Sequence, residues 1–166
     1  MLPIIATIAL ISVAAVTDWR KGEIPNWLTL PPLLIAPFMW FCADALPGLQ
    51  FSVLGLFGCG LVPYFAFRRG AMGGGDVKLF AALGAINGMQ LGMEMLMLSL
   101  FAGVAQTILV LIHKRRLGTC LRNCFRLTVN VLLPRARRFE IESLTLTELR
   151  LGPAILVGSA LSLVLP

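Results

Sequence analysis

The stretch LMLSLFAGVAQTILVLI at residues 96–112 contains no charged side chain. A second uncharged run, IIATIALISVAAV, occupies residues 4–16. Both runs are continuous and lack the period-two alternation of a transmembrane barrel strand, so they predict helices long enough to enter or cross a bilayer. These two stretches decide the fold class, because they indicate an all-α membrane protein.

The composition of the whole chain agrees with this interpretation. The 166 residues are 58% hydrophobic and only 13% charged, with a mean hydropathy of +0.88. Soluble domains carry about 25% charged residues, which cover their surface, so this composition excludes an ordinary water-soluble domain. We expect a single membrane domain over residues 1–166, a bundle of about six transmembrane helices. Its apolar segments are residues 2–16, 24–41, 51–67, 77–89, 91–112 and 152–165.

The distribution of charge predicts the topology. If the segments cross alternately, all 14 basic residues lie on one side, and the opposite connections carry only Asp44 and Glu94. The positive-inside rule then places the basic loops in the cytoplasm and both termini outside. The first segment has no basic residue before it and is followed by a poor cleavage site, so we expect a retained anchor in the cell membrane. The net charge of +6 therefore needs no nucleic acid as a partner.

The longest connection, residues 114–150, is expected to be a cytoplasmic loop with an interfacial amphipathic helix. Its basic face would hold Arg115, Arg122 and Arg126 and would attract anionic lipid. His113, Cys120 and Cys124 could share one helical face, but a fourth metal ligand is missing and Gly118 interrupts the helix. We expect no metal site there, and no disulfide framework in a reducing compartment.

Two polar motifs stand out from the apolar background: DWRKGEIPN at residues 18–26 and MGGGDVK at residues 72–78. Each places an acid at a cytoplasmic helix end. A first span of about 15 residues covers only about 22 Å of a roughly 30 Å hydrocarbon core, which should draw Asp18 into the membrane edge. The brief fourth segment should do the same to Asp76. Two such carboxyl groups brought together would share a proton and could catalyse attack of water on a peptide carbonyl.

Each of these residues also has a simpler possible role when its motif is taken alone. Gly73–Gly75 leave the backbone bare, which suits an extended substrate or merely a flexible turn. Asp76 could cap a helix, and Asp18 could be a solvated flanking charge. The small residues Gly55, Gly58 and Gly60 are expected to permit close helix packing.

The order TDWRKGEIPN, AMGGGDVKLFAALG and LRLGPAILVG, at residues 17–26, 71–84 and 149–158, resembles the type IV prepilin peptidases, membrane aspartyl proteases of the GxGD class. The resemblance implies that Asp18 and Asp76 are catalytic and that Gly73 and Gly75 are the motif glycines. It implies cleavage of the short basic leader of prepilin-like precursors at the cytoplasmic membrane face. The sequence shows no metal, nucleotide or flavin motif, so we expect water as the only co-reactant and no cofactor. Supporting positions would be Lys78, Arg20, Pro25 and Asn26.

The chain departs from the long bacterial members in one respect. Those members carry a cytoplasmic insert with paired cysteines between the first two spans and also methylate the new N-terminus with S-adenosylmethionine. Only residues 18–23 fill that position here, so we expect a peptidase without methyltransferase activity, most similar to the peptidases of Tad/Flp pilus systems. Archaeal-type preflagellin peptidases are the next nearest in form.

Three alternatives remain at this point. A small transporter or channel subunit would use the acids for cations or protons, but should place them near mid-span. A non-catalytic pilus assembly scaffold would tolerate Asp to Asn changes. A presenilin-type protease shares GxGD but sets its first aspartate after a tyrosine, and the only tyrosine here is Tyr64.

Overall fold

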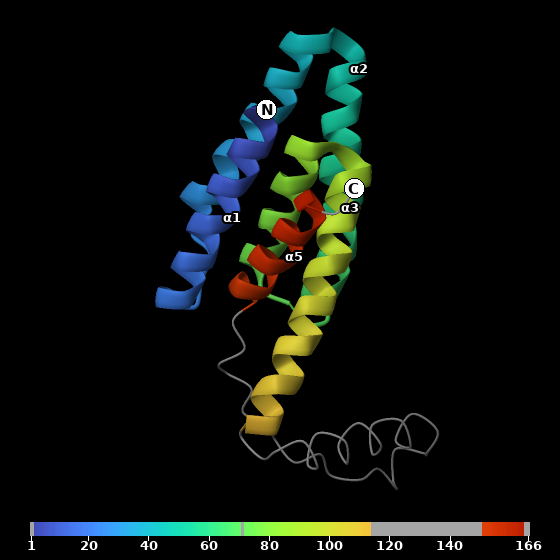
Figure 1. Cartoon of the computed structure of the whole chain (residues 1–166). Coiled ribbons are helices and arrows are strands. Elements are labelled where there is room, and N and C mark those ends of the chain that lie inside the picture. The colour runs from blue at the N-terminus through green and yellow to red at the C-terminus, as the bar shows by residue number, and fades with distance from the viewer. Residues whose placement is uncertain (1, 71, 114–150, 165–166) are drawn as a thin grey trace, which may run out of the picture. The chain divides into compact units, whose positions relative to one another are not determined.

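The computed structural model describes residues 2–70, 72–113 and 151–164. Within these ranges the chain forms four α-helices and no strand, which confirms the all-helical prediction (Figure 1). The helices are α1 (Leu2–Lys21), α2 (Asn26–Arg68), α3 (Gly74–His113) and α5 (Gly152–Val164). The predicted amphipathic surface helix, with Cys120 and Cys124, lies outside the described residues.

Contacts within the chain divide it into two units. The first comprises Met1–Gly103 and Arg150–Pro166, and the second comprises Val104–Leu149. Of the second unit only residues 104–113 are described, and they form the last part of α3. The expectation of one membrane domain stays a prediction, and the two cavities and the side-chain contacts described below belong to the first unit.

The helix count differs from the six separate segments expected from the sequence. The second and third expected segments form one element, α2, which is interrupted where Asp44 (φ −139°, ψ 23°) and Ala45 (φ 49°, ψ −131°) leave helical geometry. The fourth and fifth form α3, interrupted at Gly88 (φ 79°, ψ 178°). Figure 1 shows the chain reversing direction at both places. The connections were expected to be loops, but they are so short that helical hydrogen bonding resumes within a few residues.

Three of the helices are long and apolar enough to cross a bilayer: α1 from Pro3 to Lys21, α2 and α3. Large apolar side chains are exposed on all three, among them Ile5, Leu34 and Phe101, which are 66%, 75% and 71% exposed. Such extensive apolar exposure is not found on soluble monomers, whereas lipid tails accommodate it at no cost. The apolar helices therefore fit a membrane protein.

The interruption at Gly88 frees backbone carbonyls that a continuous helix would pair. Side chains of α2 satisfy two of them. The Ser52 hydroxyl donates to the Ala85 carbonyl oxygen at 2.7 Å, and the Trp40 Nε1–H donates to the Ile86 carbonyl oxygen at 3.1 Å. Unpaired carbonyls in an apolar environment cost several kcal/mol each. The two bonds thus stabilise the turn in α3 and attach it to α2.

Glycines allow the second half of α2 to approach α3 backbone to backbone. A Cβ atom built on Gly55 would overlap the carbonyl oxygen of Gly84, and one on Gly84 would overlap that of Gly55. Side chains at either position would therefore separate the helices. The structure confirms the expected close packing at Gly55, while Gly58 and Gly60 face the side chains of Met89 and Ala81.

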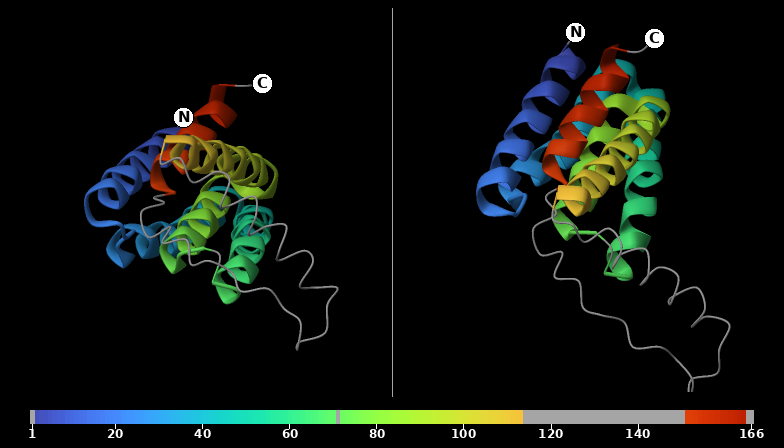
Figure 2. Two further views of the ribbon diagram at one scale, coloured as in Figure 1. Left: turned by 90° about the horizontal axis from the view of Figure 1, so that it is seen from below. Right: turned by 60° about the horizontal axis from the view of Figure 1, so that its bottom comes forward.

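Helix α1 packs along α5, and the two lie side by side in Figure 2. It is also attached to α3 by a polar contact, because the Asn87 Nδ2–H donates to the Thr7 hydroxyl at 2.8 Å and to the Leu83 carbonyl oxygen at 3.0 Å. Thr7 is fully buried. Buried polar pairs of this kind hold helices in one register, which fixes α1 relative to α3.

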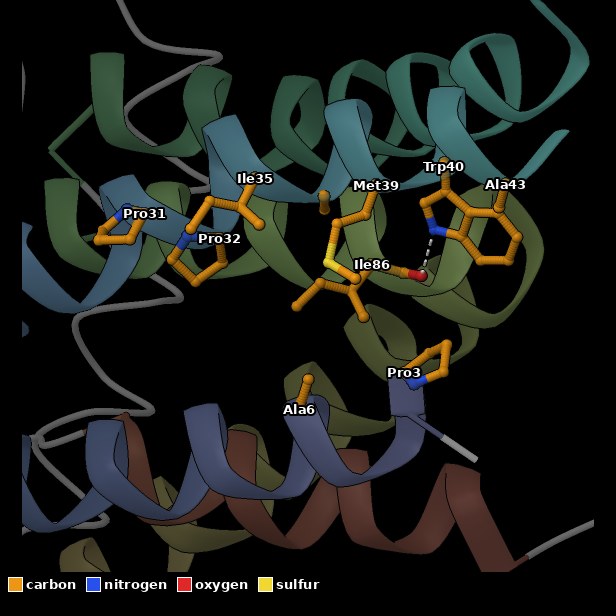
Figure 3. A pocket seen from close by; sticks show the side chains of 10 residues that line it. Pro3, Ala6, Pro31, Pro32, Ile35, Met39, Trp40, Ala43 and Ile86 are labelled. Carbon is orange, nitrogen blue, oxygen red and sulfur yellow. Dashed lines mark hydrogen bonds between the residues drawn. The ribbon is translucent and has the colours of Figure 1, made fainter. Parts of the chain in front are cut away.

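An apolar cavity of about 420 Å³ lies between the N-terminal part of α1 and the first half of α2 (Figure 3). Pro3 and Ala6 of α1 face Met39 and Trp40 of α2 across it, with Ile86 of α3 at the side. None of its lining residues is titratable. The cavity therefore has no chemistry of its own and contrasts with the polar cavity described next.

Candidate active site

Asp18 lies inside α1, not beyond the end of the first span as the sequence suggested. Helix α1 continues to Lys21 and ends at Gly22, whose φ of +71° favours glycine and whose N–H donates to the Asp18 carbonyl oxygen at 2.8 Å. The Asp18 side chain is only 7% exposed. The simpler interpretation of Asp18 as a solvated flanking charge is therefore wrong.

The Asp18 carboxylate has one hydrogen-bond donor that the sequence did not reveal. Its Oδ2 accepts the backbone N–H of Gly152, the first residue of α5, at 2.7 Å. The N–H groups of a first helical turn lack partners within their own helix, and the partial positive charge there favours a carboxylate. Gly152 belongs to the LRLGPAILVG stretch, so a glycine–proline pair opening the last apolar segment was the available signal.

Asp76 lies in the first turn of α3 and is partly buried. Gly73 and Gly75 each lie close to a neighbouring residue, Asp76 and Ile24 respectively. A Cβ on Gly75 would lie 2.9 Å from the Ile24 Cβ and 3.2 Å from the Ile24 carbonyl oxygen, and a Cβ on Gly73 would lie 3.1 Å from the Asp76 Oδ2. Gly75 thus lets the start of α3 approach the connection between α1 and α2.

This approach brings the two acidic motifs together. Asp18 and Asp76 line one polar cavity of about 550 Å³. The C-terminal end of α1 and the N-terminal ends of α3 and α5 lie at the same end of the helices (Figure 1). The other lining residues are Gly22, Glu23, Ile24, Pro25, Asn26, Gly73, Gly74 and Gly75.

Of the remaining residues singled out from the sequence, Pro25 and Asn26 line this cavity, whereas Lys78 and Arg20 do not. Lys78 donates from Nζ to the Asn26 Oδ1 at 2.7 Å, which connects the beginning of α3 to the beginning of α2. Pro25 is the extended residue immediately before α2 (φ −70°, ψ 146°), so it precedes the helix instead of occupying its first turn. Arg20 is exposed in the last turn of α1.

Replacement by alanine should lower the stability of the protein by different amounts at Gly74 and at Gly75. We expect Gly75→Ala to destabilise the protein by about 1–3 kcal/mol, because the new methyl group overlaps Ile24. Gly74→Ala is the matched control: its Cβ would meet only the Phe67 ring, at an ordinary 3.4 Å, and its effect should stay within about 0.5 kcal/mol. Unfolding titrations in mixed micelles with increasing SDS measure both. Equal losses at the two positions would contradict the proposed contact.

Comparison with known proteins gives one match. The sequence model of the type IV leader peptidase family matches residues 5–108, a range that contains Asp18, the glycine triplet and Asp76 but not α5. No curated protein and no solved structure matches the chain. Since the matched range covers more than half of the sequence, this chain belongs to the type IV leader peptidase family.

Proposed function

We propose that the chain is a membrane aspartic endopeptidase that removes the short basic leader of type IV prepilin-like precursors. Membership of the leader peptidase family supports a peptidase acting on substrates of this general kind. The observation that carries the proposal further is the shared cavity of Asp18 and Asp76, because two neighbouring carboxyl groups are the catalytic unit of aspartic proteases.

The reaction follows from the properties of such a pair. Two close carboxyl groups do not both ionise readily, so they hold one proton between them. The ionised group takes a proton from water as the water oxygen attacks the scissile carbonyl carbon. The protonated group donates to the carbonyl oxygen, and the tetrahedral intermediate then collapses as a proton passes to the leaving amine. A cavity of about 550 Å³ has room for a short extended segment of substrate and the water.

The position of the acids supports a peptidase at the membrane surface over a transporter. Asp18 lies in the last turn of α1 and Asp76 in the first turn of α3, whereas a proton or cation path would use acids near mid-span. Arg20 and Lys21 follow Asp18 two and three residues later. With the positive-inside rule, they support a cytoplasmic active site in the cell membrane with both termini outside.

The short connection between α1 and α2 supports a function limited to proteolysis. Only residues 22–25 separate the two helices, which leaves no room at this position for an inserted domain. We therefore propose that the chain cleaves its precursor without methylating it, in the manner expected of Tad/Flp-type pilus peptidases.

Replacing either aspartate tests the catalytic pair. We expect Asp18→Asn and Asp76→Asn each to lower kcat by a factor of about 10³ or more, because an amide cannot exchange the shared proton. The measurement is cleavage of a co-purified Tad/Flp-type prepilin, followed by gel shift and N-terminal sequencing of the product. Asp44→Asn is the matched control, since Asp44 lies at the turn of α2 and does not line the cavity.

Parent-like cleavage by either cavity variant would show that the pair is not catalytic. Loss of cleavage in all three variants would indicate a general effect on folding. If the parent itself cleaves none of a panel of pilin-like precursors, the proposed substrate class is wrong.

Glu23 is expected to contribute to recognition of a basic leader. Its side chain is exposed at the cavity that holds the aspartates, and opposite charges attract weakly across solvent. Glu23→Lys should raise KM about three- to tenfold with little change in kcat, and the difference should shrink at high salt. Glu23→Gln serves as the neutral control and should give an intermediate KM. An unchanged KM in Glu23→Lys would exclude this role.

A further inference from the structure

The N-terminus of α5 makes a buried contact with Asp18, which lies far from it in the sequence. The Gly152 N–H and the Asp18 Oδ2 are 2.7 Å apart, although the residues are separated by 134 positions in sequence. Helix α5 lies outside the range matched by the family. The matched range therefore does not include this contact, although the stretch LRLGPAILVG that contains Gly152 is part of the resemblance drawn from the sequence.

The local sequence directs this particular N–H at the carboxylate. The Ile155 N–H donates to the Leu151 carbonyl oxygen at 2.9 Å, which closes the first turn of α5. Pro153 has no N–H to offer. Gly152 is thus the donor that the start of α5 presents to Asp18, and a hydrogen bond to a charged acceptor at a helix N-terminus is among the stronger ones.

The same contact leaves no space for a side chain at residue 152. A Cβ on Gly152 would lie 2.7 Å from both the Asp18 Cβ and its Oδ2, and 3.0 Å from its Cγ. Real Cβ atoms do not approach other atoms so closely, so any larger residue must displace the carboxyl group or the start of α5. Because α5 packs along α1, a shift of its start would disturb that packing, so we expect the Asp18 side chain to move instead.

We propose that Gly152 is a positioning residue for the peptidase reaction: its N–H holds Oδ2 of Asp18 while its missing side chain allows the approach. Oδ1 is then the oxygen left to face Asp76 and the attacking water. The inference rests on the proposed catalytic role of Asp18. The two carboxyl groups of the pair come from α1 and α3. In this proposal the start of α5 orients one of them, the carboxyl group of Asp18.

Kinetics of Gly152→Ala test this role. Because small displacements of a reacting group can cost about 10²-fold in rate, we expect kcat to fall by about that factor, while KM stays within twofold because the rest of the cavity is untouched. Pro153→Ala is the matched control in the next position, since it keeps the Gly152 N–H and adds no side-chain atom at residue 152; it supplies one further backbone N–H in the first turn of α5. Its kcat and KM should equal those of the parent. A parent-like kcat for Gly152→Ala, or equal losses in both variants, would overturn the proposal.

A second measurement does not require peptidase activity or a stable Gly152→Ala variant. In full-length chain labelled with ¹⁵N-glycine, hydrogen exchange of the Gly152 amide should be slow in the parent and in Asp76→Ala, and markedly faster in Asp18→Ala. Unchanged exchange in Asp18→Ala would overturn the contact. If exchange behaves as expected but the parent cleaves no precursor, the proposed function fails and the contact remains, so the two failures are distinguishable.

Discussion

The close approach of Gly75 to Ile24 is the contact on which the site depends. It brings the first turn of α3 against the four-residue connection between α1 and α2. Asp76 follows Gly75 directly, and Asp18 lies one turn before that connection, so this single contact places both carboxyl groups at one cavity. A side chain at residue 75 would separate the two elements, which explains why the chain has glycine there.

The surrounding helices can hold this geometry because their freed backbone groups are paired. Turns at membrane depth expose carbonyls that lipid cannot solvate. Here the turn at Gly88 is stabilised by Ser52 and Trp40, and Asn87 connects α3 to Thr7 of α1. Together with the glycine contact between Gly55 and Gly84, these bonds fix the first half of α3, and Asp76 lies at its start.

Hydrophobicity and the two polar motifs were enough to predict an all-helical membrane protein with Asp18 and Asp76 at helix ends. Hydropathy could not predict how short the connections at Asp44–Ala45 and at Gly88 are, because the apolar runs on either side are the same for a long loop and for a tight turn. The second and third expected segments are therefore the two parts of α2, and the fourth and fifth are the two parts of α3. The extent of α1 was also underestimated, since Asp18, Arg20 and Lys21 are polar yet helical.

The contribution of Gly152 could not be predicted for a different reason. A backbone N–H carries no sequence signature, and its partner is 134 positions away. The glycine–proline pair at residues 152–153 indicated only where a helix begins. The glycines of residues 73–75, by contrast, lie next to an acid in the same motif, so the sequence alone indicates a site there.

The proposed reaction requires Asp18 and Asp76 to face one another in the membrane-embedded protein. Cross-linking examines this when Asp18→Cys is combined with Asp76→Cys in a chain whose native cysteines are changed to alanine, and membranes are treated with a short thiol-specific cross-linker. We expect efficient internal cross-linking of this pair and none when Asp18→Cys is combined with Asp44→Cys. If both thiols of the first pair react singly with the reagent but do not become joined, the shared cavity does not exist in the membrane and the account is wrong.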